Sequence, residues 1–146
     1  MKELFTLLVD FATPAFDETL RLRDDILRKP LGLEFFPEQI AEEYLDLHLA
    51  CYNEDFELVG CLVLTPKDDK TIKMRQVVVR EDCQRQGVGR RLVEDSELVC
   101  QERGFKKMVL NARTTAVPFY LALDYKKSGK PFIEVSIEHY KMSKAL

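Results

Sequence analysis

Several features that would mark a specialised class of protein are missing from this sequence. No apolar stretch approaches the roughly 20 residues that a membrane-spanning helix needs. The apolar run near the N-terminus (1–18) is short and contains an acidic residue, so it fits a secretory signal poorly. The net charge of −3 argues against a general nucleic-acid surface, because phosphate binding needs a basic face. We therefore expect a soluble, cytoplasmic protein with no membrane or nucleic-acid partner.

Cysteines and histidines are few and poorly spaced for metal binding. None of the four cysteines forms a C-x-x-C pair, which disfavours zinc ribbons and thioredoxin-like sites, and we expect no metal. Cys51 and Cys61 lie in apolar runs, which is typical of reduced, buried thiols.

No internal repeat, low-complexity tract or Gly/Ser-rich linker divides the chain. Its composition, 46% hydrophobic and 32% charged, is that of an ordinary globular protein. A chain of 146 residues can bury roughly two-thirds of the surface that it exposes when unfolded. Residues 1–146 are therefore expected to form one domain.

The sequence instead carries many strand patterns and few helical ones. Apolar and β-branched runs predict strands at residues 3–11, 44–52, 56–65, 71–79, 106–112 and 132–144. Helical periodicity predicts helices at about 15–29, 88–103 and 116–123, with irregular segments at 29–40 and 128–131.

These elements predict how the strands pair. Short charged turns join the three strands between residues 44 and 79, so these strands should form an antiparallel meander. The strand–helix–strand unit of residues 71–112 should instead contain parallel strands with a right-handed crossover, and Gly104 should close its helix in the left-handed conformation. The predicted class is α/β of the α+β type, with a mostly antiparallel central sheet flanked by helices.

The segment CQRQGVGRRL (83–92) lies where a strand becomes a helix. It offers no Ser, Thr, Asp or Asn as a helix cap, so the first helical N–H groups need water or an outside acceptor. Gly87 and Gly89 remove β-carbons that would hold an anion off the backbone. Three arginines and no acid lie between Gln84 and Leu92. These features favour a phosphate site, whereas the alternative is a tight turn with solvated arginines.

Two familiar phosphate loops do not match this segment. No G-x-x-x-x-G-K-[ST] string of a Walker loop exists in the chain. A dinucleotide fingerprint would need glycine at position 92, where the chain has Leu92.

The segment resembles the acetyl-CoA-binding motif of the GNAT acyltransferases. That motif reads Q/R-x-x-G-x-G/A after a strand, and Gln84, Gly87 and Gly89 fall on its defining positions. Downstream, Ala116-x-x-Phe119-Tyr120 resembles the A-x-x-F-Y of the same family, separated from the first motif by one helix and one strand, as in the family. The resemblance implies the GNAT fold, in which a parallel β-α-β core binds acetyl-CoA.

Two positions depart from the family pattern. Arg113 stands where many relatives have an asparagine that touches the cofactor, so this contact is in doubt, although an arginine can itself reach a phosphate. The family's L-G-F/Y is Leu123-Asp124-Tyr125 here, and aspartate tolerates a left-handed backbone better than most residues.

The resemblance implies that an amine attacks the thioester of acetyl-CoA directly, and it suggests which residues hold the co-substrate. Loop amides would bind the pyrophosphate, and the edge of the strand ending at Val79 would align the pantetheine and offer an N–H to the developing oxyanion. An acyl group longer than acetyl stays open. The predicted cofactor-binding residues are Val77, Val78, Val79, Gln84, Arg85, Gln86, Gly87, Val88, Gly89, Arg90, Arg113 and Phe119.

The resemblance also implies a general acid. Tyr120 occupies the matching position, and a phenol with a pKa near 10 stays protonated at neutral pH and can protonate the departing thiolate. The alternative is that Tyr120 packs in the core beside Phe119. For the base, His139 on the last strand is favoured, with His48, Glu81 or a water chain as alternatives. A purely structural histidine is the competing interpretation.

The resemblance also implies that the acceptor amine binds near the first helix. Arg21, Arg23, Phe35 and Gln76 are the predicted substrate-binding residues. The alternative for the two arginines is a solvated helix face paired with Asp24 and Asp25. A small-molecule amine is the expected partner, because the acidic residues are scattered and form no groove for basic peptides. A protein or peptide acceptor, a non-catalytic acyl-CoA-binding domain and a homodimer stay open as alternatives.

Overall fold

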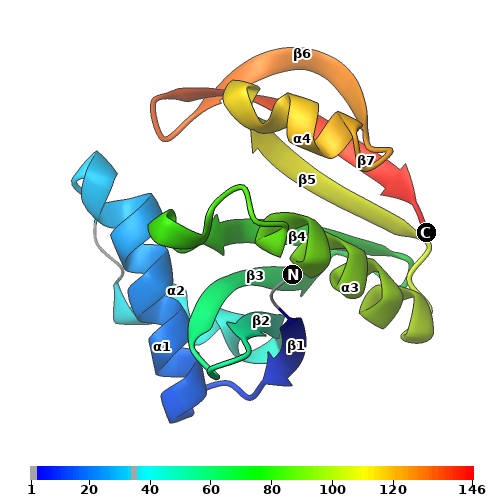
Figure 1. Ribbon diagram of the computed structural model, residues 1–146. Helices are drawn as coiled ribbons and strands as arrows, with labels where there is room; N and C mark the ends of the chain where they lie inside the picture. The colour runs from blue at the N-terminus through cyan, green and yellow to red at the C-terminus, as the bar shows by residue number, and fades with distance from the viewer. Residues whose placement is uncertain (1–2, 34–35) are drawn as a thin grey trace.

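A computed structural model describes residues 3–33 and 36–146, and within these ranges seven strands form one sheet in the order β1-β2-β3-β4-β5-β7-β6 (Figure 1). All neighbouring strands are antiparallel except β4 and β5. The predicted fold class is therefore confirmed, as are the antiparallel meander and the parallel pair. The strands are β1 (Leu4–Val9), β2 (Leu47–Asn53), β3 (Leu58–Pro66), β4 (Thr71–Val79), β5 (Lys107–Arg113), β6 (Lys126–Glu134) and β7 (Ile137–Ala145).

The long helices lie where the periodicity predicts them. The first is α1 (Pro14–Arg23), capped by the Thr13 hydroxyl and continued by a π-helical turn η1 (Asp24–Arg28) and a 3₁₀ turn η2 (Lys29–Leu31). The others are α3 (Val88–Glu102) and the short α4 (Val117–Leu121), which follow the 3₁₀ turns η4 (Glu81–Cys83) and η5 (Thr114–Ala116), respectively. The segment predicted to be irregular contains a short helix α2 (Pro37–Ala41), followed by η3 (Glu42–Leu45).

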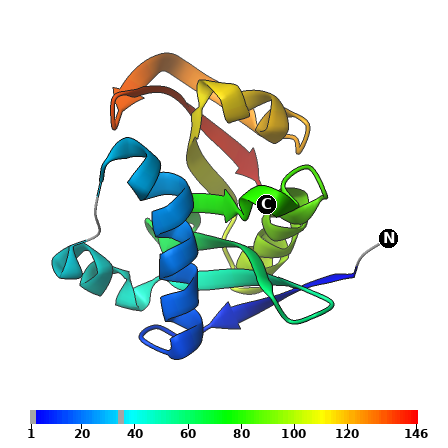
Figure 2. The ribbon, with the colours of Figure 1, turned by 60° about the vertical axis from the view of Figure 1, so that its left-hand side comes forward.

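α1 and α3 cover opposite faces of the sheet, and β3 shows why. A Cβ added to Gly60 would lie 2.8 Å from Val88 Cγ1 on α3, whereas the thiol of the next residue, Cys61, lies 3.9 Å from the Thr19 carbonyl on α1. Successive side chains of a strand point to opposite faces. Figures 1 and 2 show the two helices on the two sides of the sheet. The two faces are called the α1 face and the α3 face below.

The α3 face carries the main core. The predicted apolar stripe of α3 is buried there, including Leu92, Val93 and Cys100, and packs on sheet residues such as Leu62 and Met108. A fully buried Leu side chain contributes about 1.5–3 kcal/mol relative to an exposed one. Gly104 ends the helix with a φ of 89°, as predicted. Cys51 and Cys61 are buried and reduced, which is also confirmed.

The C-terminal prediction of one loop and one strand is wrong. Residues 126–145 form a hairpin of two strands, β6 and β7, joined at Val135 and Ser136. Both turn residues have positive φ, 46° and 64°, a conformation that Asn and Gly signal and Val does not. Pro131 is tolerated because β6 is the edge strand and its pairing shifts register between Ser128 and Phe132.

Within the described ranges, no helix combines the length and the hydrophobicity that crossing a bilayer requires.

Candidate active site

β4 and β5 separate soon after they begin to pair. Only Thr71–Lys73 is in register with Lys107–Val109, and beyond this point the two strands diverge (Figure 1). A bulge in β4 accompanies the divergence, because Cys61 pairs with Val78 while Val63 pairs with Arg75. The wedge between the strands is therefore built into the sheet.

A cavity of about 430 Å³ fills this wedge. The strands contribute Gln76, Val77 and Asn111, α4 contributes Tyr120, and β7 contributes His139. η1 adds Arg28 from the α1 face, and the tip of the β6–β7 hairpin adds Glu134. The cavity therefore brings together the predicted acid and the favoured base, which lie on elements far apart in the sequence.

The open edge of β4 presents backbone groups to the wedge. The Arg80 N–H donates to the Val59 carbonyl at 2.8 Å, so the backbone of Arg80 points toward β3. Because these directions alternate along a strand, the N–H and C=O of Val79 and Val77 point toward the wedge. Val78 points its backbone toward β3 and its buried side chain away from α3, so it does not offer the edge groups that Val77 and Val79 present to the wedge.

The loop that precedes α3 is open at its backbone. Gly87 is the N-cap with a φ of 87°, and no side chain caps the helix. The first amides of α3 therefore have no partner within the helix, and a Cβ at Gly87 would meet no atom within 4 Å. Gln84 folds back, and its side-chain amide donates to the Val79 carbonyl at 3.2 Å. Gln84 thus fixes the end of β4 beside the loop.

The arginines of this segment divide into two groups. Arg91 binds Asp95 at 2.8 Å and the Leu4 carbonyl at 2.9 Å, so it ties α3 to β1 rather than facing the loop. Arg90 forms an exposed pair with Glu94 at 3.1 Å. Arg85 has no ion pair with any residue in the described ranges. The positive charge near the loop is smaller than the sequence suggests.

Packing against Phe119 requires glycine at position 89, in addition to the open backbone that glycine gives the loop. A Cβ at this position would lie 3.3 Å from Phe119 Cζ and 3.7 Å from Val79 Cγ2. Phe119, which is 38% exposed, therefore lies over the first turn of α3. The contact joins α4 to α3 at the mouth of the wedge.

Tyr120 is held in the core with its hydroxyl open to the cavity. It is 7% exposed and packs edge-on against Phe119 and Tyr125, with ring centroids 5.0 and 5.7 Å away. Every fully buried side-chain N or O atom in the described part of the chain has a hydrogen-bond partner, whereas the Tyr120 hydroxyl has none there, so that hydroxyl reaches the cavity. Burial raises the pKa of Tyr120 to about 12. The phenol is therefore protonated throughout the physiological pH range.

His139 presents one ring nitrogen for proton uptake. Its Nδ1 lies 2.7 Å from the Ile137 carbonyl, and because a carbonyl only accepts, Nδ1 carries the hydrogen. In the neutral ring, Nε2 then holds a lone pair, 3.7 Å from a carboxylate oxygen of Glu134. Phe132 stacks on the ring at a centroid distance of 5.9 Å and fixes its plane.

The alternative bases lie elsewhere. His48 is buried against Phe16 on the α1 face, and its Nε2 donates to the Glu43 carbonyl at 3.1 Å. Burial lowers the pKa of His48. Neither His48 nor the exposed Glu81 lines the cavity.

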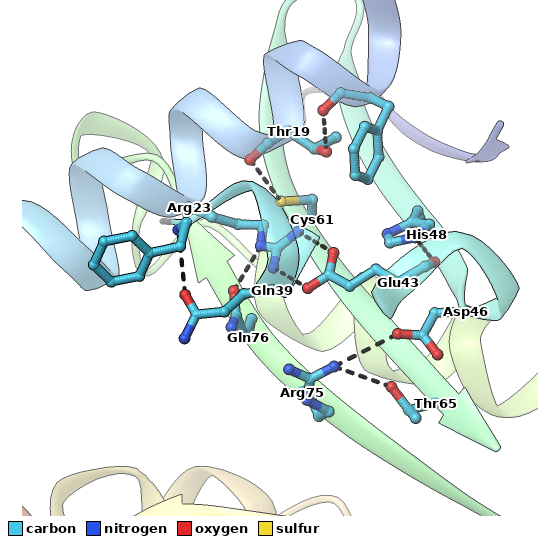
Figure 3. Close-up of polar contacts among 12 residues, drawn as sticks. Thr19, Arg23, Gln39, Glu43, Asp46, His48, Cys61, Thr65, Arg75 and Gln76 are labelled. Carbon is cyan, nitrogen blue, oxygen red and sulfur yellow. Dashed lines mark hydrogen bonds and ion pairs between the residues drawn. The ribbon is translucent and has the colours of Figure 1, made fainter. Parts of the chain in front are cut away.

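Arg23 lies neither in a substrate site nor on a solvated helix face, the two positions that the sequence suggested. It is 1% exposed and binds both carboxylate oxygens of Glu43, at 2.9 and 2.6 Å, while its Nε donates to Gln76 Oε1 at 2.6 Å (Figure 3). It therefore neither lies on a solvated face nor reaches a substrate. The stripe that it shares with Phe16 indicates burial, but the partner Glu43 is not visible from the sequence.

The other predicted substrate residues are dispersed. Arg21 is exposed and lines a separate hollow between α1 and α2. Gln76 lines the main cavity and adopts a φ of 51° in the bulge, which few residues other than glycine tolerate. Arg113, which was predicted to contact the cofactor, also lines the cavity. Phe35 lies outside the described residues, and its neighbour Phe36 is exposed.

Sequence reasoning missed Lys73 and Arg75, which line the cavity together with Arg28. The available signal was the alternation of charged and apolar residues in Thr71–Val79, which puts Lys73 and Arg75 on one face of the strand. The divergence of β4 and β5 beyond Lys73, which opens the cavity beside them, has no sequence signature.

A sequence model of the acetyltransferase (GNAT) domain matches residues 27–146, which is most of the chain. The chain belongs to the GNAT acetyltransferase family. A UPF0039 protein of Schizosaccharomyces pombe is 32% identical over 97 residues, which cover 65% of each chain. The matched part of this GNAT chain spans between 51% and 65% of the length of such curated relatives.

Solved structures share the GNAT fold over almost the whole chain. A putative N-acetyltransferase from Lactobacillus plantarum superposes with a TM-score of 0.86 at 22% identity, covering 98% of both chains. A GNAT family acetyltransferase from Elizabethkingia anophelis with acetyl-CoA bound superposes with a TM-score of 0.71 at 21% identity, again covering 98% of both chains. At these identities, both comparisons show the shared fold.

Proposed function

We propose that the protein is an N-acetyltransferase that moves an acetyl group from acetyl-CoA to the primary amine of a small molecule, with both substrates bound together. The observation that carries the proposal is that Tyr120 and His139 line the same cavity. Tyr120 can protonate the departing sulfur while His139 takes a proton from the amine.

The residues around the wedge fit CoA. The open amides of the loop from Arg85 to Arg90, together with the dipole of the 15-residue helix α3, suit a pyrophosphate. The bare backbone at Gly87 leaves the approach free of side chains. The outward N–H and C=O of Val77 and the outward N–H of Val79 suit the amides of pantetheine, which would extend the sheet like an added strand.

The bulge in β4 directs a donor at the reacting carbonyl. Acetyl-CoA supplies the acetyl group as a thioester. The Val77 N–H points into the wedge beside the bulge, where it would donate to the carbonyl oxygen on which negative charge develops. The Arg23–Gln76 hydrogen bond holds the bulge in place, so this donor needs no rearrangement when charge appears.

Tyr120 acts as the general acid. Its pKa of about 12 keeps it protonated, and its hydroxyl has no competing hydrogen bond within the described residues. A thiol has an ordinary pKa near 8.5, so proton transfer from the phenol is unfavourable unless it accompanies cleavage of the C–S bond. We therefore assign a concerted transfer to the sulfur.

His139 acts as the general base. The Ile137 carbonyl fixes its tautomer, so Nε2 faces the cavity side with a lone pair. Glu134, 3.7 Å away, would stabilise the imidazolium that forms when the amine loses its proton. The amine reaches this nitrogen from the α1 face, whereas Tyr120 comes from the α3 face.

The volume of the cavity favours a small acceptor. About 430 Å³ lies within the range of ligand sites, roughly 300–1,000 Å³. The test is a thiol-release assay with acetyl-CoA over polyamines, aminosugars, aminoglycosides, amino acids and peptides, combined with calorimetry of acetyl-CoA binding. We expect binding in the micromolar range and turnover of small amines. Binding without turnover of any amine would contradict the catalytic role, and turnover of peptides alone would contradict the small acceptor.

A further inference from the structure

The α1 side of the cavity carries an excess of positive charge. Arg28, Lys73 and Arg75 line it together with Arg113, and Glu134 is the one carboxylate in the part of the lining that the structure describes. A site built for a polycationic amine would show the opposite balance. A substrate that brings its own anion would therefore meet charge of the opposite sign on this side.

These cations lie away from the loop assigned to the pyrophosphate. Lys73 and Arg75 of β4 pair with Thr65 and Val63 of β3, respectively. Thr65 and Val63 point to the same face of the sheet as Cys61, which is the α1 face. The pyrophosphate loop begins α3, which covers the other face. Lys73 also precedes Val79 by six residues, which is roughly 20 Å along a strand. The positive charge therefore serves the acceptor side of the wedge.

Arg75 is held rigidly but is only partly neutralised. Its Nη1 lies 3.5 Å from an Asp46 carboxylate oxygen and 3.1 Å from the Thr65 hydroxyl (Figure 3). Asp46 is buried on the side of Arg75 away from the lining residues of β5 and does not itself line the cavity. A guanidinium fixed in this way is a preorganised partner for a carboxylate or a phosphate.

Lys73 is a second cation on this side of the cavity. It has no ion pair with any residue in the described ranges. Burial lowers its pKa, and the charges of Lys67, Arg75 and Lys141 lower it further, against an opposing contribution from Glu134. Positive charge is thus crowded around Lys73, and a bound anion would relieve the repulsion.

We propose that the acceptor is an amine that also carries an anionic group, a carboxylate or a phosphate, and that this group binds on the Lys73–Arg75 side of the cavity. The amine of the same molecule then points toward His139, which lines the same cavity. The inference rests on the proposed function and narrows its substrate class. The required ligand has at least one amine and one anion within a span that a 430 Å³ cavity encloses.

Matched pairs of amines test the inference. Each pair differs only in the anion: glucosamine 6-phosphate against glucosamine, phosphoethanolamine against ethanolamine, and phenylalanine against phenethylamine. We expect the anionic member of at least one pair to have a kcat/KM about 10- to 100-fold higher, the size of one or two partly buried charge-assisted hydrogen bonds. The phosphate pairs and the carboxylate pair distinguish the two anions.

Substitution then locates the anion site. In Lys73→Gln, the ratio of anionic to uncharged kcat/KM should fall by about tenfold, the effect of one charged hydrogen bond. Arg28→Gln provides a second variant, and Lys130→Gln, which removes the same charge from an exposed position outside the cavity, should keep the ratio. Calorimetry of acetyl-CoA should give the same Kd for Lys73→Gln as for the natural chain.

The failure of this inference differs from the failure of the proposed function. Equal or better turnover of the uncharged amines, or a ratio that Lys73→Gln leaves unchanged, overturns the anionic acceptor while the acetyltransferase remains. A weaker Kd for acetyl-CoA in Lys73→Gln would assign the charge to the co-substrate and overturn it as well. Absence of thiol release with every anionic amine also rejects it, and absence of acetyl-CoA binding rejects the proposed function itself.

Discussion

The Nε atom of Arg23 donates to Oε1 of Gln76 at 2.6 Å and so ties the end of α1 to the bulge in β4. The same guanidinium binds both oxygens of Glu43, which is itself buried. One arginine therefore connects the first helix, the segment before β2 and the strand that opens the wedge (Figure 3). The shape of the candidate active site depends on this buried cluster.

Removing Arg23 should destabilise the fold strongly. Arg23→Met leaves the carboxylate of Glu43 buried without its partner, which costs about 3–5 kcal/mol. The free energy of unfolding from urea titration measures the loss. The double variant Arg23→Met/Glu43→Leu should recover part of it, because no unpaired charge remains. Arg21→Met, on the exposed side of the same helix, should change stability by less than about 0.5 kcal/mol. A similar effect of both single variants would contradict the cluster.

Tyr120→Phe should lower kcat by about 10²- to 10⁴-fold, the usual contribution of a positioned acid. The ring contacts with Phe119 and Tyr125 persist, so both stability and the Kd for acetyl-CoA should stay near those of the natural chain. Steady-state thiol release and calorimetry measure the two quantities. Tyr44→Phe, which removes an exposed hydroxyl, is the matched control. An unchanged kcat would remove Tyr120 from the mechanism.

Substitutions of two glycines near α3 should affect different properties, stability for Gly60 and acetyl-CoA binding for Gly89. A Cβ at Gly60 would lie 2.8 Å from Val88 Cγ1 and 2.9 Å from the Val78 carbonyl, so Gly60→Ala should cost about 1–3 kcal/mol of stability. A bulky side chain at Gly89 would instead push Phe119 away from the mouth of the wedge. Gly89→Leu should therefore raise the Kd for acetyl-CoA while leaving the melting temperature close to that of the natural chain. Equal CoA affinity in both variants would argue against the loop as the pyrophosphate site.

Most helices and strands could be predicted because their signals lie within the elements themselves. The stripe of α3, the apolar runs of β2 to β4 and the Gly104 cap each depend on neighbouring residues alone. The β6–β7 turn was not predicted because Val135 and Ser136 adopt positive φ, although neither is a residue type that favours this conformation. Tertiary pairing forces this turn, and single-sequence propensity does not register it.

Prediction of the site was uneven for a related reason. Tyr120, His139 and the loop at Gly87 were found through motifs or through rare residue types, and the structure places Tyr120 and His139 in one cavity. Lys73 and Arg75 were missed because the cavity that they line opens where β4 and β5 diverge, and this divergence accompanies a bulge without a local signal. Arg23 was misplaced since its burial requires Glu43, 20 residues away.

His48 should make the fold sensitive to mild acid. Burial lowers its pKa in the folded protein, whereas the unfolded chain keeps a value near 6.5. Between the two values the unfolded state binds more protons, so stability is present above pH 6.5 and is lost as the pH falls below it, by up to about 1.4 kcal/mol per pH unit. Asp46, whose pKa is raised by burial, contributes with the opposite sign at lower pH.

The contribution of His48 is isolated by difference. Urea unfolding of the natural chain and of His48→Gln should be compared between pH 7.5 and 5, since glutamine can still donate to the Glu43 carbonyl that His48 binds at 3.1 Å. We expect the natural chain to lose stability over this range and the variant to lose less, because it lacks the imidazole while Asp46 and the Arg23–Glu43 pair are common to both. Parallel pH profiles would show that His48 has the same pKa folded and unfolded, and would assign the acid sensitivity to the carboxylates.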